Sequence, residues 1–490
     1  GEPTIDMMGV DPRRFGDYAT KSFLIKKNEE AYANVFTIHY PDEEREAGRP
    51  LRQAPCYDRL KEHGAVFGQK FGWERANWFA PKGVEQIDDW SFRRSKWFEH
   101  VGNECKNVQA NVGLLDMTAF AKCRISGPGA ESFLDNLVAN KLPKKNGRVN
   151  LCHALNKNGG VLSEYTVAKE SNDSYYIVSA GAFQRLDHDW IKQWMPKDRS
   201  VTFENLTNSI GVLVLAGPKA RDLMSKVSSA DFSNEKFPWL SSQKIDVGLA
   251  PSIAMRMNFV GELGWEFHHP IEYQNHIFDT LMEAGKEFKL KPFGIRAMDS
   301  LRIEKTYKLV GTEMSIEYSP FESGLDRFVH LNKGNFIGRD ALVKWQQKGF
   351  QNKLVTLEVK DVKDADALGK PPPLKKVQNT VTAEHGDVNQ DQVLAVLKTC
   401  YDPEIPINIV DLGLVYQIDC YKLPNNNNAI RIIMTLTSVG CGMGNILAED
   451  IKQRVQTVTN VDSVDVKIVY DPPWSHEMIS EAAKFELGLW

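Results

Sequence analysis

The sequence of 490 residues contains little that points to a membrane, a secretory route or a nucleic acid. It has no run of about 18 apolar residues, and residues 1–20 contain no charged-then-apolar leader, so neither a membrane span nor a secretory signal is predicted. Lysine and arginine total 60 against 64 for aspartate and glutamate, which leaves no basic excess for binding nucleic acid. We therefore expect a cytoplasmic protein with neither a membrane nor a nucleic acid among its partners.

Cysteine spacing and glycine motifs exclude further classes of site. The seven cysteines are scattered without C-x-x-C spacing, which favours reduced thiols over a disulfide framework or a structural zinc site. No G-x-G-x-x-G motif opens a strand–turn–helix unit, so we expect no flavin site built by this chain alone. The chain begins at Gly1 rather than at a methionine, which is consistent with a processed, trimmed or incomplete chain.

The composition, 42% hydrophobic and 25% charged, is that of a globular protein with roughly two to four domains. Residues 1–53 are rich in proline, arginine and aspartate and are predicted to be a connector, whereas residues 54–350 alternate strands and helices and indicate one α+β body. The polar segment 351–387 starts with an expected strand at 354–360 and then contains three consecutive prolines, which is typical of a linker. Residues 388–490 are expected to form a compact α/β domain.

Hydrophobic periodicity and turn residues predict the individual elements. In the body, strands are expected at 123–128, 165–170, 174–180, 211–217 and 253–261, and helices at 130–138, 218–227 and 273–288. In the C-terminal domain, helices are expected at 388–400 and 445–458, and strands at 411–421, 429–439 and 463–474.

The stretch NFVGELGWEF at 258–267 carries two glutamates, Glu262 and Glu266, that are four residues apart. If the backbone stays extended, both carboxylates emerge on one face of a strand. Such carboxylates can accept a pair of neighbouring N–H donors from a ligand in a charge-assisted arrangement. The alternative is that both glutamates are solvated turn residues.

This stretch belongs to a set of motifs that occur in a characteristic order: NVGLLDMTAF at 111–120, LNKNGGVLSEYTV at 155–167, NFVGELGWEF and RAMDSLRIEK at 296–305. Together they resemble the folate-binding aminomethyltransferase fold of the glycine-cleavage T-protein, and more closely the C-terminal half of the dimethylglycine and sarcosine dehydrogenases. Residues 1–20 and 72–81 resemble that family as well. The resemblance implies tetrahydrofolate-dependent transfer of a one-carbon unit from N-methylated glycine derivatives or their iminium products, with FAD only if a missing upstream domain supplies its site.

The resemblance also implies roles for individual residues in gripping the pterin ring. Glu266 matches the acid that accepts hydrogen bonds from the pterin, and Glu262 is a second candidate. Phe259 stands where relatives often carry a tyrosine, so the aromatic ring is kept and the hydroxyl is lost.

Three further residues are implied around the folate. Glu164 lies where T-proteins carry an aspartate near the reactive nitrogens, and it is expected to orient the amine or to accept its proton; the alternative is an exposed strand residue. Arg302 is expected to contact a carboxylate in a fork geometry, and its alternative is a helix-surface pair with Asp299 or Glu304. Asp116 is expected to cap or orient a loop near the site.

The C-terminal domain resembles the SufT and PaaD-like iron–sulfur assembly family through YDPEIPINIVDLGLVY at 401–416, TLTSVGCGMG at 435–444 and DPPWSHEMISEAAKFELGL at 471–489. Cys441 lies in a glycine-flanked turn before an expected helix, and a helix N-terminus favours the thiolate, so Cys441 is a candidate nucleophile or ligand of iron or an iron–sulfur cluster. The alternatives are a buried, inert thiol and a GCGMG backbone nest for phosphate. Asp402 and Asp411 are weaker candidate ligands that could instead cap helices or turns.

Two functions are open from the sequence. The first is an enzyme that transfers a one-carbon unit, with an appended iron–sulfur assembly domain. The second is a non-catalytic maturation factor that serves iron–sulfur assembly proteins with a folate-binding module. T-protein-like assembly factors carry a K-G-C-Y-x-G-Q-E motif, but Asn335 stands where their cysteine would be, which favours the enzyme. The expected fold is therefore an α+β, T-protein-like body with most of its C-terminal β-barrel missing, followed by a small α/β SufT-like domain.

Overall fold

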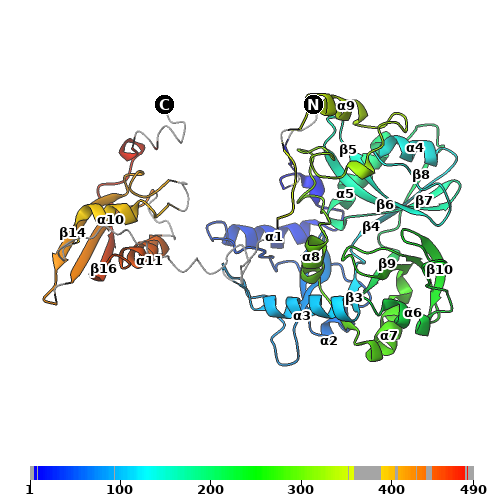
Figure 1. Cartoon of the computed structure of the whole chain (residues 1–490), viewed down its shortest axis with the longest axis horizontal. Helices are drawn as coiled ribbons and strands as arrows, with labels where there is room; N and C mark the ends of the chain where they lie inside the picture. Colours follow the sequence, from blue (N-terminus) through cyan, green and yellow to red (C-terminus); the bar gives the residue numbers. More distant parts are fainter. Residues whose placement is uncertain are drawn as a thin grey trace. The chain divides into compact units, whose positions relative to one another are not determined.

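A computed structural model describes most of the chain: residues 5–7, 9–92, 94–350, 352–357, 388–402, 407–425, 427–437, 444–480 and 483. The chain divides into two compact units, the first comprising residues 1–32 and 39–367 and the second comprising residues 33–38 and 368–490. Figure 1 shows the helices and strands of each unit. Each unit is described separately.

The first unit opens with helices and a hairpin: η1 (Pro12–Arg14), α1 (Lys21–Ala33), α2 (Tyr57–Glu62), β1 (Ala65–Lys70), β2 (Trp73–Phe79) and α3 (Trp97–Ala110). The two strands are antiparallel and are joined by Phe71 and Gly72, which both have positive φ angles, as a tight hairpin turn requires. A Cβ atom at Gly72 would lie 2.6 Å from the ring of Tyr18, so the N-terminal segment packs directly on this turn. Most of the predicted connector, residues 1–32 and 39–53, thus belongs to the first unit.

A six-stranded sheet forms one half of the body, in the order β10-β11-β12-β9-β3-β13. Its strands are β3 (Gly113–Asp116), β9 (Ile210–Ala216), β10 (Ser242–Val247), β11 (Ala250–Met255), β12 (Gly264–Pro270) and β13 (Lys291–Pro292). Two helices pack on one face of this sheet: α6 (Ala220–Val227) and α7 (Gln274–Ala284). The short helices η3 (Ile271–Tyr273) and η4 (Lys286–Phe288) flank α7. Helices α3 and α8 (Ile295–Glu304) pack on the other face. Strand β9 is apolar on both sides because both faces are covered: Leu213 and Leu215 point to one layer, Val212 and Val214 to the other.

A five-stranded antiparallel sheet forms the other half, in the order β5-β6-β7-β4-β8. Its strands are β4 (Ala121–Ser126), β5 (Val149–Leu155), β6 (Val161–Ser171), β7 (Ser174–Ser179) and β8 (Thr202–Asn205). Helices α4 (Ala130–Leu137) and α5 (Gln184–Trp194, after η2 Gly181–Phe183) cover one face. On the other face Tyr176 and Val178 pack against Met255 of the six-stranded sheet, so the two sheets share a buried layer.

The chain leaves the body through η5 (Asp326–Phe328) and α9 (Arg339–Lys348). The strand predicted at 354–360 is not formed in residues 352–357, and the rest of that stretch lies outside the described residues. The predicted strand at 253–261 is also shorter than expected, since β11 ends at Met255 and residues 258–263 form a turn before β12.

The second unit contains α10 (Gln390–Leu397), β14 (Val415–Lys422), β15 (Asn428–Met434), α11 (Gly444–Val455), β16 (Val461–Ile468) and η6 (His476–Met478). Its sheet has the order β14-β15-β16, with an antiparallel first pair and a parallel second pair that α11 connects. Asn389 and Gln392 form a capping box that starts α10. The order and type of these five helices and strands are those predicted from the sequence.

Candidate functional site

Glu266 lies on β12 and is buried, with 6% of its surface exposed. Its carboxylate accepts no hydrogen bond from the residues that the structure describes, and the nearest side-chain nitrogen among them is Nε2 of His268 at 3.4 Å. Nδ1 of His268 is in turn 3.1 Å from the hydroxyl of Tyr176 on the facing sheet. Buried carboxylates are normally satisfied by hydrogen bonds, so Glu266 has acceptor capacity available for an external donor.

The alternation of β12 explains this position. Trp265 and Phe267 point into the core beneath α6 and α7, so Glu266 and His268 point to the opposite face. Met255, which pairs with Glu266 across β11 and β12, packs in the layer shared by the two sheets. Glu266 therefore faces the side of the sheet on which the second sheet and α8 lie.

Glu164 reaches the same layer from the five-stranded sheet. It pairs in register with His153 of β5, and its Oε2 lies 2.9 Å from Nε2 of that fully buried histidine. Thr166 lies directly opposite Val178, so the alternation of β6 and β7 places Glu164 on the same sheet face as Tyr176. Both candidate carboxylates, Glu164 and Glu266, thus belong to the facing surfaces of the two sheets.

Glu262 has a different environment. Asn258 accepts hydrogen bonds from the N–H groups of Val260 and Gly261, and Gly261 has a φ of 74°, so the backbone turns before β12 begins. The extended backbone that would bring Glu262 and Glu266 to one face is therefore absent, and that prediction is wrong. Glu262 instead forms an ion pair of 3.1 Å with Lys305. This matches the alternative of a turn residue.

Phe259 lies in the same turn and is partly buried. Its ring centroid is 6.1 Å from that of Tyr307, and it packs against the apolar cluster between the six-stranded sheet, α3 and α8. Phe259 is therefore next to the sheet face that carries Glu266.

Arg302 is on α8, as predicted, but Nε and Nη1 of its guanidinium form hydrogen bonds inside the protein. Nε donates to Asp299 at 2.6 Å, and Nη1 donates to the carbonyl of Tyr307 and to Glu313, each at 2.9 Å. The alternative interpretation, a pair with Asp299, is the one that the structure contains. Arg302 thus ties the end of α8 to the following loop.

Asp116 ends β3 in a buried polar cluster. It accepts hydrogen bonds from the backbone N–H of Thr118 at 2.9 Å, from the side-chain amide of Gln274 at 3.2 Å and from the thiol of Cys56 at 3.4 Å. Burial raises the pKa of Asp116. Burial lowers the pKa of the nearby Lys122 to about 7, and its Nζ donates to the carbonyl of Thr118. Asp116 thus orients the turn after β3, whereas its place near the folate stays a prediction.

Asp116 also lines a cavity of about 1290 Å³ in the first unit. Its walls come from the N-terminal segment, the β1–β2 hairpin, α3, α8 and two loops at 180–183 and 309–312. Phe120 lines this cavity and also packs in the layer between the sheets. A cavity of this size is large enough for a ligand such as a folate, although Glu164 and Glu266 are not among the residues that line it.

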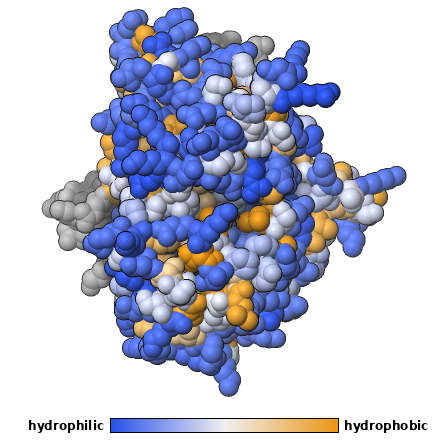
Figure 2. All heavy atoms as spheres, turned by 90° about the vertical axis from the view of Figure 1, so that its right-hand side faces the viewer, coloured by the Kyte–Doolittle hydropathy of each residue, from blue (hydrophilic) through white to orange (hydrophobic). Residues whose placement is uncertain are grey.

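A smaller groove of about 420 Å³ runs over the edge strand β10 and its neighbours β11 and β12. It is lined by Ile210, Ile245, Pro251, Ile253 and His268 among others. Figure 2 shows the side of the molecule on which β10 lies: apolar side chains gather near the middle of a mostly hydrophilic face.

Sequence reasoning missed His268, Tyr176, His153 and Lys122. His268 could have been found, because it is two residues after Glu266 on a strand and so shares its face. The other three depend on sheet register and on contacts between distant segments.

In the second unit, Asp402 is buried and its backbone N–H donates to the carbonyl of Ile407. Asp411 accepts a hydrogen bond of 2.6 Å from the side chain of Asn408. Cys441 lies outside the described residues. Among the residues that the structure does describe, no cluster of three or more potential ligands could hold a metal ion, and no helix is long and apolar enough to cross a bilayer.

Three family models match the chain. Residues 56–333 match the GCVT N-terminal domain, residues 1–54 the FAD dependent oxidoreductase central domain, and residues 390–468 the iron-sulfur cluster assembly protein family. A solved aminomethyltransferase T of the glycine cleavage system from Bartonella henselae has a TM-score of 0.52 at 21% identity, with 61% of this chain and 76% of that one covered. This likeness shows the T-protein-like fold.

Two curated relatives extend the comparison. Dimethylglycine dehydrogenase from Homo sapiens is 34% identical over 462 residues, which are 93% of this chain and 51% of the relative. An aminomethyltransferase from Thermoanaerobacter sp. (strain X514) is 34% identical over 265 residues, which are 54% of this chain and 72% of the relative. The chain spans about half the length of the dimethylglycine dehydrogenases that it matches. The resemblance inferred from the motifs is confirmed: the chain belongs to the GCVT aminomethyltransferase family and carries an iron–sulfur cluster assembly protein domain in its C-terminal part.

Proposed function

We propose that the first unit binds a reduced folate and catalyses transfer of a one-carbon unit at the methylene level. The observation that carries this proposal is the buried carboxylate of Glu266, which no described residue satisfies with a hydrogen bond. A pterin ring presents an amino group and a ring N–H side by side, and these two donors fit one carboxylate. Phe259, in the turn next to β12, supplies an apolar wall beside that site.

Tetrahydrofolate, when bound, supplies the nitrogen that accepts the one-carbon unit. Glu164 is proposed to stabilise positive charge at the reacting amine or to accept its proton. His153, the cross-strand neighbour of Glu164, holds its carboxylate by the contact of 2.9 Å and is itself fully buried. A fixed carboxylate loses little conformational freedom when it acts, so His153 is a positioning residue for Glu164.

The proposed donors are N-methylated glycine derivatives or the iminium ions formed from them. Human relatives of this chain are named dimethylglycine dehydrogenase and sarcosine dehydrogenase, and residues 1–54 match a domain of FAD-dependent oxidoreductases. Oxidation of the amine would require a flavin site that we do not expect residues 54–350 to build. The cytoplasmic location expected from the sequence stays a prediction, since the names of these relatives place them in mitochondria.

The C-terminal domain is proposed to act on iron or iron–sulfur clusters, with Cys441 as the reactive thiol and iron–sulfur assembly proteins as partners. The whole chain as a non-catalytic maturation factor is the less favoured function. The enzyme is supported by the aminomethyltransferase family match, which covers more than half of the chain, and by the buried position of Glu266 between the two sheets.

Isothermal calorimetry with 5-formyltetrahydrofolate tests the proposal. Glu266→Gln should weaken binding by about 1–3 kcal/mol, because it removes a charged acceptor from buried donors. Glu262→Gln and Glu272→Gln are controls in the same region, one ion-paired in the turn and one exposed, and both should bind like the wild type. Equal affinities for wild type and Glu266→Gln would remove the pterin assignment.

A further inference from the structure

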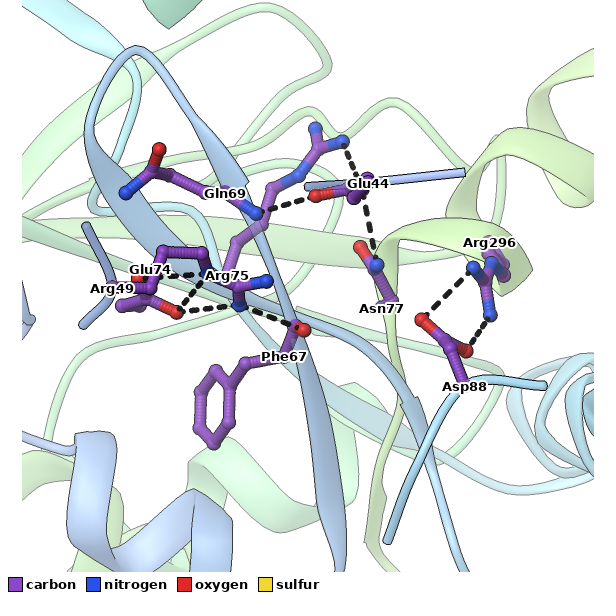
Figure 3. Close-up of polar contacts among 9 residues, drawn as sticks. All are labelled: Glu44, Arg49, Phe67, Gln69, Glu74, Arg75, Asn77, Asp88 and Arg296. Atoms are coloured by element: carbon purple, nitrogen blue, oxygen red, sulfur yellow. Dashed lines mark hydrogen bonds and ion pairs between the residues drawn. The ribbon is translucent and has the colours of Figure 1, made fainter. Parts of the chain in front are cut away.

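Three arginines lie close together around the β1–β2 hairpin, and Figure 3 shows that their hydrogen-bonding states differ. Arg49 donates three bonds to Glu74, the shortest at 2.7 Å, and one to the carbonyl of Phe67 at 2.8 Å. Arg296 forms two bonds to Asp88, at 2.6 and 3.2 Å. Both guanidinium groups therefore already have the forked carboxylate partner that arginine prefers.

Arg296 is also held from its flat sides. Its guanidinium carbon lies 4.3 Å from the ring centroid of Trp97 and 5.6 Å from that of Trp90. Such cation–π contacts add to the ion pair and leave little freedom to bind a ligand. Arg296 thus lines the cavity but is not available to bind a ligand.

Arg75, on β2, is different. In the described part of the chain its one ion pair is with Glu44, at a long 3.8 Å, and its Nε is buried without a hydrogen-bond partner. The Glu44 carboxylate is already used by two neutral donors, the backbone N–H of Gln69 at 2.5 Å and the side-chain amide of Asn77 at 3.1 Å. Arg75 consequently has several N–H groups that no described residue uses.

A second cation lies beside it. Lys70 has no ion pair or hydrogen bond with any described residue, and the register of the hairpin puts its side chain on the same face as Arg75. Gly68, directly opposite Arg75, leaves the space that Glu44 fills, since a Cβ atom there would lie 2.4 Å from a Glu44 oxygen. Two cations on this face therefore share a single carboxylate.

Both cations and Glu44 line the cavity of about 1290 Å³, together with aromatic residues that include Tyr18 and Phe120. We propose that Arg75, assisted by Lys70, binds the carboxylate of the ligand that occupies this cavity. This inference rests on the proposed function, because that function supplies two ligands with a carboxylate: the glycine-type amine and the glutamyl tail of the folate. When the ligand is absent, Glu44 holds Arg75 only by their long ion pair. When the ligand is present, its carboxylate competes with Glu44 for the guanidinium.

The test measures the affinities of three probes by calorimetry: N,N-dimethylglycine, 5-formyltetrahydrofolate and tetrahydropteroate, which has the pterin but no glutamyl carboxylates. Arg75→Gln should weaken binding of one of the two carboxylate probes by about tenfold or more, and Arg75→Lys should weaken it less because the charge remains. Glu44→Gln should tighten the same probe several-fold, since it removes the competing charge. Lys82 is exposed and lies outside the cavity, so Lys82→Gln removes a positive charge away from the site and should leave all three affinities unchanged.

The pattern identifies the source of the carboxylate. Weaker binding of dimethylglycine with unchanged folate binding points to the amine. Weaker binding of 5-formyltetrahydrofolate with unchanged tetrahydropteroate binding points to the glutamyl tail. Wild-type affinity of Arg75→Gln for both carboxylate probes would overturn the inference, and so would a wild-type protein that binds neither.

Failure of this inference is distinguishable from failure of the proposed function. Tetrahydropteroate binding by wild type and Glu266→Gln reports on the pterin site alone. If that binding is absent, the proposed function fails, while the dimethylglycine measurement still decides the role of Arg75. Melting temperatures of the Arg75 variants within a few degrees of the wild type would show that altered binding is not a folding defect.

Discussion

Oε2 of Glu164 lies 2.9 Å from Nε2 of His153, a histidine with no exposed surface. This contact holds the Glu164 carboxylate in place through a side chain that has no access to solvent. We expect Glu164→Gln to lower the rate of methylene transfer to tetrahydrofolate by about 10²- to 10⁴-fold, the usual contribution of a general acid or base, with little change in folate affinity. His153→Phe should lower the rate as well, by a smaller factor, because the carboxylate remains but is no longer positioned.

The measurement is single-turnover formation of methylenetetrahydrofolate above the uncatalysed rate, with folate affinity determined separately by calorimetry. A loss of folate binding that matches the loss of rate in Glu164→Gln would contradict the assignment, because it would make Glu164 a binding residue.

The hydroxyl of Tyr176 is 3.1 Å from Nδ1 of His268, whose other ring nitrogen faces Glu266. Tyr176→Phe removes this bond and should weaken binding of 5-formyltetrahydrofolate by about 0.5–1.5 kcal/mol, the net value of one hydrogen bond. Tyr175→Phe is the matched control: Tyr175 is the adjacent residue of β7, points to the opposite face and donates to Glu131. If both variants bind the folate like the wild type, His268 does not orient Glu266.

Asp187 is buried on α5 and accepts a hydrogen bond of 2.6 Å from Ser179. Burial raises its pKa from 3.8 to about 7, so between these values the folded state holds a proton that the unfolded state has released. The free energy of unfolding should therefore fall as the pH rises from about 4 to 7, with a contribution from this residue on the order of 1–4 kcal/mol. Asp187→Asn should flatten that dependence.

Denaturant unfolding of the first unit at a series of pH values measures this effect. Asp189 lies two residues along the same helix, is only partly buried and pairs with Arg185, so Asp189→Asn should keep the wild-type slope. Unchanged pH dependence in Asp187→Asn would show that burial does not raise the pKa of Asp187 in the folded protein.

The sequence places Cys441 before a helix, in a glycine-flanked turn, and this context predicts a lowered thiol pKa. Cys400 and Cys420 provide internal controls, since burial raises the pKa of Cys400 to about 11 and also raises that of Cys420. Cys441 should therefore alkylate first at pH 7, as measured by mass spectrometry after brief exposure to iodoacetamide. Labelling of Cys441 no faster than Cys420 would leave the assembly role without a chemical basis.

Local elements were predictable because their signals are local. The apolar run of β9 and the capping box before α10 depend on residues within a few positions of one another, and both elements form where the sequence predicts them. The boundary at Gly261 was missed, since an extended reading of 258–267 ignores the positive φ of that glycine and the turn that Asn258 closes.

The residue types at the candidate site were likewise readable from the sequence: Glu164 and Glu266 in their motifs, and Arg302 on its helix. Their environments were not, because each depends on segments that are far apart in the chain. The sheet register brings His153 beside Glu164, the packing of two sheets brings Tyr176 to His268, and the loop after α8 brings Glu313 to Arg302. Sequence spacing defines which residues share a face of one element, whereas burial and hydrogen-bond satisfaction arise only when those faces pack together.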